Sequence, residues 1–132
     1  MLRFATPKKS QVSARAFKTA SFAKAAKKAL ISEVDLCRVI RQVMKGQADD
    51  LGGGVFKKRL NDNMHRSIIL TKGENSWIFE YLFAKKDREN IDHAELVAFR
   101  KLAKAYVGLT ERQLDSLLTD KDLIEIYHDD KT

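Results

Sequence analysis

The sequence GGGVFKKRL at residues 52–60, followed by MHRSIIL at 64–70 and SWIFEYLFAKKDREN at 76–90, carries the strongest structural pattern of the chain. These runs are rich in β-branched and aromatic residues, and Asn, Asp and Gly lie between them. That composition is typical of consecutive β-strands joined by turns. We therefore predict strands over residues 55–60, 65–71 and 76–84.

A loop of four residues, Asn61–Met64, separates the first two predicted strands. If this loop closes a plain hairpin, Arg59 stands opposite Arg66. Lys57 then faces Ile68 on the same side of the sheet, because side chains alternate with period two. Like charges in direct opposition destabilise a sheet by roughly 0.2–1 kcal/mol. Such a pair is expected where a polyanion must be bound, so we interpret it as part of a site for an RNA backbone.

The third predicted strand, Ser76–Ala84, is apolar on both faces, which is typical of a central strand. Regular alternation gives one face Trp77, Phe79, Tyr81 and Phe83, and the other face Ile78, Leu82 and Ala84 with the acid Glu80. The strand runs directly into Lys85-Lys86-Asp87-Arg88. It therefore delivers a second basic cluster at its C-terminal end, where two strands and a loop converge.

Helical periodicity predicts helices before and after these strands. Their limits are Thr19 or Ser21 to about Leu30, Ser32 to Gly46, Asp92 to Gly108, and Thr110 to Leu118. Ser, Thr and Asp cap helix starts, and Gly commonly ends helices. Asp92 with Glu95, and likewise Thr110 with Gln113, have the spacing of a capping box. Leu30 completes the apolar stripe of the first helix.

These elements predict an α+β fold for the 132 residues. A mostly antiparallel sheet of four or five strands carries an N-terminal helical hairpin, and two further helices precede the last strand at 123–127. Residues 15–18 read as a short edge strand and residues 48–54 as a flexible linker. We expect a flexible arm over 1–13, a single domain over 14–128 and a polar tail over 129–132.

The net charge of +7 is unevenly distributed. Residues 1–32 contain eight Lys or Arg and no acid, whereas residues 87–132 contain 11 acids and seven bases. This asymmetry predicts a polyanionic partner on one side, or an acidic partner protein. The N-terminus also resembles a mitochondrial transit peptide in composition, but from Ala14 onward it fits the fold. No apolar run reaches membrane-spanning length, and the single Cys37 suits a reducing compartment, so we expect a cytoplasmic protein without membrane contact.

Four short motifs, taken together, match one protein family: LGGG with KKR at 51–59, R-x-I at 66–68, FAK-x-x-R-x-NI at 83–91 and LIEI at 123–126. Over residues 14–128 the chain resembles a RelE/HigB-type toxin of bacterial type II toxin–antitoxin systems, in the longer branch of the RelE/ParE superfamily. The resemblance implies an endoribonuclease that cleaves mRNA, typically in the ribosomal A site, and that a cognate antitoxin silences. It also implies a toxin–antitoxin complex that binds operator DNA through the antitoxin.

The resemblance further implies which residues act. Catalysis is expected from Arg59, Arg66, Lys86 and Arg88, and RNA binding from Lys57, Lys58, Lys85 and His65. Attack of an RNA 2′-hydroxyl on its neighbouring phosphate builds negative charge, to which arginines donate bidentate hydrogen bonds. Asp92 stands where one family member carries a catalytic tyrosine. Two candidates for the general base therefore remain open. One is a lysine, if cationic neighbours lower its pKa, and the other is His65.

The histidines His65, His93 and His128 lack the spacing of metal ligands, so we predict no metal and no cofactor. Two other functions remain open. ParE-like gyrase inhibitors share the fold class, and a non-catalytic domain that binds nucleic acid or a partner protein would carry the same basic cluster. Ribosome-dependent cleavage of mRNA would distinguish the endoribonuclease from both alternatives.

Overall fold

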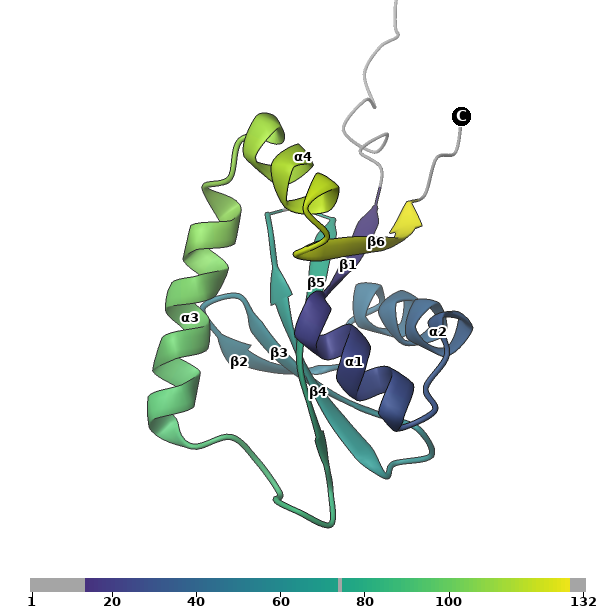
Figure 1. The fold of residues 1–132 in the computed structure, drawn as a ribbon. Helices are drawn as coiled ribbons and strands as arrows, with labels where there is room; N and C mark the ends of the chain where they lie inside the picture. Colours follow the sequence, from purple (N-terminus) through teal and green to yellow (C-terminus); the bar gives the residue numbers. More distant parts are fainter. Residues whose placement is uncertain (1–13, 74, 129–132) are drawn as a thin grey trace, which may run out of the picture.

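The computed structural model describes residues 14–73 and 75–128, which form six strands and four helices (Figure 1). In chain order they are β1 (Arg15–Thr19), α1 (Ala20–Lys28), α2 (Glu33–Met44), β2 (Asp49–Gly52), β3 (Val55–Leu60), β4 (His65–Thr71), β5 (Ser76–Ala84), α3 (His93–Val107), α4 (Glu111–Thr119) and β6 (Leu123–His128). The predicted arm and tail lie outside the described residues. No helix in this described part of the chain is long and apolar enough to cross a membrane.

The strands form one sheet in the order β2-β3-β4-β5-β1-β6. Neighbours run antiparallel except β1 and β5, which are parallel. The predicted α+β class is confirmed, but the sheet is mixed and has six strands instead of the four or five, mostly antiparallel, that we predicted. One unpredicted strand is β2, which lies in the supposed linker. Its sequence DDLG has no strand pattern, and pairing with β3 overrides this weak propensity.

β1 lies inside the sheet, between β5 and β6, so the prediction of an edge strand at residues 15–18 is wrong. Ala16 and Phe17 are both fully buried. Ala16 packs in the core beneath α1 and α2, whereas Phe17 packs on the other face with Leu114 of α4. A strand that buries both faces takes a central place, and five residues are too few to show that pattern in the sequence.

The hairpin of β3 and β4 has the predicted limits and the predicted register, with Arg59 opposite Arg66. Its connecting loop holds Asn61, Asp62 and Asn63 at positive φ values of 55°, 54° and 68°. Asn and Asp tolerate this left-handed conformation better than most other residues. The loop residues therefore match the backbone that the hairpin requires.

A β-bulge at Glu80 interrupts β5. The partners on β4 are consecutive residues, while those on β5, Phe79 and Tyr81, skip Glu80. Side chains beyond the bulge consequently move to the opposite face. Phe79 packs on the α1 side, with its ring centre 5.0 Å from that of Phe22, whereas Tyr81 packs beneath α3. The predicted single aromatic face over residues 77–83 is wrong, because regular alternation does not continue through a bulge.

The bulge also directs Glu80 toward α3. There its carboxylate accepts a hydrogen bond of 2.8 Å from the hydroxyl of Tyr106. Burial raises the pKa of Glu80 above its ordinary value, although the hydrogen bond from Tyr106 acts in the opposite direction. Burial likewise raises the pKa of the Tyr106 phenol. A partly buried acid and a phenol thus join the centre of the sheet to α3.

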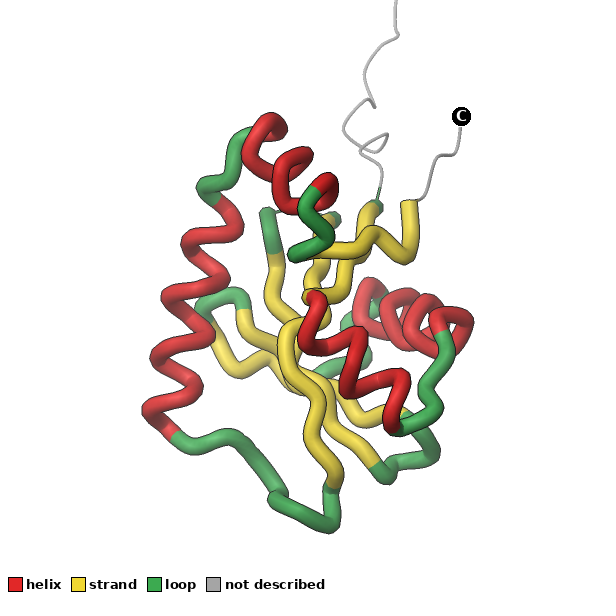
Figure 2. The backbone as a smooth tube through the Cα atoms, viewed as in Figure 1, coloured by secondary structure: helices red, strands yellow, loops and turns green. Residues whose placement is uncertain are grey.

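Helices cover both faces of the sheet, with α3 on one side and α1 and α2 on the other (Figure 2). α1 packs mainly on β5 and β1, and α2 packs on β3 and β6. The two N-terminal helices therefore rest mainly on different strands, and this arrangement differs from the helical hairpin that we predicted. Leu30, predicted on the apolar stripe of α1, is 89% exposed, because it lies in the turn after α1 with a φ of 61°.

The turn between β2 and β3 is held against α3. Its glycines, Gly52–Gly54, have φ values of 86°, 66° and 85°, which glycine adopts without strain. Arg100 of α3 donates hydrogen bonds to the main-chain carbonyls of Leu51 and Gly52. A Cβ atom added at Gly53 would lie 2.7 Å from Cγ of Arg100. Close approach, as well as backbone conformation, therefore requires glycine here.

Gly53→Ala is expected to lower the free energy of unfolding by roughly 2–4 kcal/mol, since it adds a clash with Arg100 to backbone strain. Gly73→Ala is the matched control. Gly73 has a φ of 79°, but an added Cβ meets nothing within 4 Å, so only the strain of about 1–2 kcal/mol remains. Urea unfolding followed by circular dichroism measures both variants. Equal losses would show that Arg100 does not constrain the turn.

Candidate nucleic-acid interface

Three basic residues of the β3–β4 hairpin lie on the face of the sheet that α3 covers. Lys57 pairs with Ile68, and Arg59 pairs with Arg66. Ile68 is fully buried in the core beneath α3. Because side chains two residues apart share a face, Arg66 points to the same side as Ile68, and so do their partners on β3. The hairpin thus places Lys57, Arg59 and Arg66 together.

The two arginines have different environments. Arg66 is only 8% exposed, and its Nη1 donates to the main-chain carbonyls of Asn63 at 3.0 Å and His65 at 3.3 Å. These bonds fix its guanidinium against the loop. Arg59 is exposed to solvent. The pair therefore combines one buried guanidinium, whose Nη1 is engaged by main-chain carbonyls, with one guanidinium that is open to solvent.

The turn after β5 closes the same end of the sheet. Lys85 donates its main-chain N–H to the carbonyl of Met64 at 2.9 Å, which ties this turn to the β3–β4 loop. The side chains of Lys85 and Lys86 are exposed, and both residues line a surface hollow with residues 62–65. The basic cluster after β5 therefore adjoins the loop that Arg66 holds.

His65 and Lys58 lie on the other face of the sheet, because each is adjacent in sequence to an arginine of the pair. His65 lines a hollow with Lys28 near the end of α1 and with Lys86 and Arg88 of the turn after β5. Its Nδ1 lies 3.1 Å from the side-chain amide of Asn61. His65 and Lys58 thus lie on the sheet face opposite the two hairpin arginines, while His65 adjoins Lys86 of the turn after β5.

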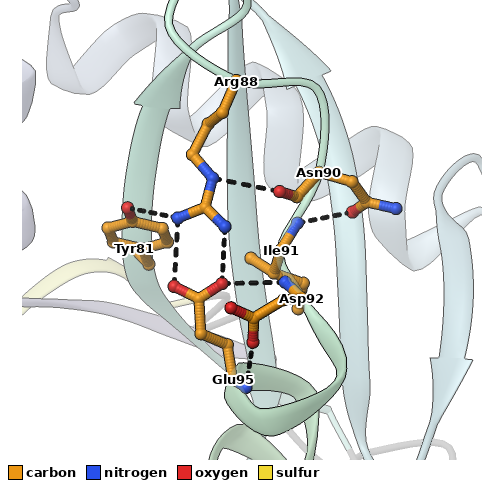
Figure 3. Close-up of polar contacts among 6 residues, drawn as sticks. All are labelled: Tyr81, Arg88, Asn90, Ile91, Asp92 and Glu95. Atoms are coloured by element: carbon orange, nitrogen blue, oxygen red, sulfur yellow. Dashed lines mark hydrogen bonds and ion pairs between the residues drawn. The ribbon is translucent and has the colours of Figure 1, made fainter.

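Arg88 is held in a network of polar contacts (Figure 3). Its Nη1 and Nη2 donate to the two carboxylate oxygens of Glu95, at 3.0 and 2.6 Å. Nη1 also donates to the hydroxyl of Tyr81 at 3.3 Å, and Nε donates to the carbonyl of Asn90 at 3.0 Å. The guanidinium lies 5.5 Å from the ring centre of Phe83. The hydrogen bonds from Arg88 hold the pKa of Glu95 below its ordinary value, so the pair is ionised at neutral pH.

The sequence did not reveal Tyr81 and Glu95 as neighbours of the predicted site. It predicted Glu95 only as the partner of Asp92 in a capping box, and the structure confirms that box. The spacing was a usable signal. Arg88 follows a strand, and Glu95, seven residues later, is an acid in the first turn of the next helix. Tyr81 gave no such signal, because the bulge at Glu80 sets its face and leaves no mark in the sequence.

The fold and these side chains define a class of protein: a small α+β protein whose sheet carries a buried and an exposed arginine opposite each other on one face. Within residues 14–73 and 75–128, no group of three or more His, Cys, Asp or Glu is placed to hold a metal ion.

A family model, described as the RelE toxin of the RelE/RelB toxin–antitoxin system, matches residues 14–126. The match spans most of the chain, so the chain belongs to the RelE toxin family, and the resemblance inferred from its motifs is confirmed. Membership makes it a toxin of a toxin–antitoxin system, with an antitoxin as its partner. Comparisons with curated proteins and with solved structures found no match.

The opposed charges predict a gain of stability when Arg59 is neutralised. Arg59→Gln removes the charge opposite Arg66, and the free energy of unfolding should rise by roughly 0.2–1 kcal/mol. Urea unfolding measures the gain, which should shrink at high salt because salt screens exposed charges. Arg112→Gln, at an exposed position of α4, is the control and should change stability by less than about 0.5 kcal/mol. A loss of stability in Arg59→Gln would contradict repulsion within the pair.

Proposed function

We propose that this toxin is a metal-independent endoribonuclease that cleaves mRNA on the ribosome and stops translation and growth until its antitoxin binds. The observation that carries the proposal is the direct opposition of Arg59 and Arg66, beside Lys57 on one face of the sheet. This opposition lowers the stability of a sheet, whereas the phosphates of an RNA backbone would neutralise it. The toxin would act in the cytoplasm, and its complex with the antitoxin would bind operator DNA through the antitoxin.

The proposed reaction is attack of an RNA 2′-hydroxyl on the adjacent phosphorus. A bond from the 2′-oxygen to phosphorus forms while the bond to the 5′-oxygen breaks, which gives a cyclic phosphate and a 5′-hydroxyl. Negative charge grows on the non-bridging oxygens during this step. Arg66 is already fixed by the loop carbonyls, so it can stabilise that charge without reorganising, and exposed Arg59 adds donors from its own strand.

Two proton transfers accompany the reaction. We assign acceptance of the 2′-hydroxyl proton to Lys57, which shares a face with both arginines, since His65 points to the opposite face. We assign protonation of the leaving 5′-oxygen to Lys86, on the turn after β5. Lys58, Lys85 and His65 would bind the flanking RNA backbone around the edge of the sheet.

Primer extension on cellular mRNA after brief induction tests this function. The wild-type chain and the Arg112→Gln control should give discrete new 5′ ends inside translated codons. Arg59→Gln should reduce these ends on the order of 10²-fold, because it removes donors to the phosphoryl oxygens. Arg59 is the better position to change, since truncation of the buried Arg66 would also release the loop carbonyls.

Growth arrest with intact mRNA would overturn the ribonuclease proposal and favour inhibition of gyrase. Absence of any effect of the wild-type chain would favour a binding domain without catalysis. Equal cleavage by the wild type and Arg59→Gln would retain a ribonuclease but remove Arg59 from its site.

A further inference from the structure

Glu95 takes part in two sets of hydrogen bonds at the start of α3 (Figure 3). It forms a capping box with Asp92, in which the side chain of each residue accepts the main-chain N–H of the other at 2.8 Å. Its carboxylate also accepts hydrogen bonds from Nη1 and Nη2 of Arg88. One side chain thus caps α3 and holds the turn that follows β5.

A second capping box in the chain shows that capping alone does not need this charge. In α4, Thr110 and Gln113 make the same reciprocal hydrogen bonds at 2.9 and 3.1 Å, with a neutral amide in place of the carboxylate. A glutamine at position 95 can therefore still cap α3. The negative charge of Glu95 has its use in the pair with Arg88, where charge strengthens both hydrogen bonds.

Arg88 has little donor capacity left for RNA. A guanidinium carries five N–H donors. Arg88 makes four hydrogen bonds, to Glu95, Tyr81 and Asn90. Its charge is balanced by Glu95, and it lies against the ring of Phe83. An arginine in this environment joins β5, the following turn and α3, and is poorly placed to bind a phosphate.

We propose that Glu95 and Arg88 are positioning residues of the RNA site, which fix the turn after β5 and the Tyr81 hydroxyl without contacting RNA. The proposal rests on the proposed ribonuclease function, and it moves Arg88 out of the set of residues that touch the substrate. A main-chain hydrogen bond to the β3–β4 loop anchors the other end of the turn. With both ends held, Lys86 is presented at a fixed place beside the hairpin.

The opposite relation is masking, in which Glu95 occupies a guanidinium that an RNA phosphate would otherwise bind. Positioning and masking predict opposite effects of Glu95→Gln on RNA binding and cleavage. This substitution keeps the cap of α3 and removes the negative charge. If Glu95 positions Arg88, the substitution loosens the turn and slows the reaction. If Glu95 masks Arg88, the substitution frees a cation and strengthens RNA binding.

The test combines hydrogen exchange of the full chain without RNA and single-turnover cleavage of an mRNA on programmed ribosomes. In Glu95→Gln, amides of residues 85–91 should exchange at least about tenfold faster, because a charge-assisted pair is lost. Amides inside α3 should be unchanged, since the cap remains. The cleavage rate at saturating toxin should fall about tenfold, with a half-saturating concentration changed less than about twofold, because a correctly placed group is displaced and binding is retained.

Glu33→Gln is the matched control. Glu33 lies in the first turn of α2 and pairs with Lys18 at 2.9 Å, so its neutralisation removes an ion pair from a helix start away from the turn after β5. It should change neither exchange at residues 85–91 nor cleavage. Arg88→Gln should reproduce both effects of Glu95→Gln, and the double variant should add nothing further, because the two residues act as one unit.

Stronger RNA binding or faster cleavage in Glu95→Gln would overturn the proposal in favour of masking. Unchanged exchange would overturn it, and so would faster exchange with unchanged cleavage. If the wild-type chain does not cleave RNA, the ribonuclease function fails by itself. The exchange measurements then still decide whether Glu95 and Arg88 hold the turn.

Discussion

The register of the β3–β4 hairpin is the constraint on which the rest of the site depends. Because side chains alternate along a strand, a slip by one residue would move Lys57 and Arg59 to the α1 side of the sheet. A loop with three residues at positive φ fixes the register, and Arg66 reinforces it by donating to two carbonyls at the end of that loop. The guanidinium that we propose for phosphate binding therefore also holds the turn that positions it.

The elements that could be predicted are those whose signals are local. The turn residues Asn61–Met64, between two runs of β-forming residues, contained enough information for the limits and the pairing of β3 and β4. The bulge at Glu80 could not be predicted, because a strand that is apolar on both faces has the same pattern with or without an extra residue. β2 exists only through its pairing with β3, and the place of β1 depends on contacts with residues far along the chain.

In the candidate site, too, the local features could be predicted and those that depend on distant contacts could not. Lys57, Arg59 and Arg66 were predicted together because their relation depends on one hairpin. The hydrogen-bond partners of Arg88 could not be predicted, because they come from β5 beyond the bulge and from the first turn of α3. A sequence shows where positive charges cluster, but it does not show which of them an acid such as Glu95 already balances.

We propose that this sheet face stabilises attack by an RNA 2′-hydroxyl. The most direct measurement uses purified toxin, programmed ribosomes and an mRNA that carries a single 2′-deoxynucleotide immediately 5′ of the scissile phosphate. Cleavage should be lost at that position and continue at other codons, where the products end in a cyclic phosphate and a 5′-hydroxyl. Unchanged cleavage at the deoxynucleotide would exclude attack by the 2′-hydroxyl, because the attacking group would then come from elsewhere.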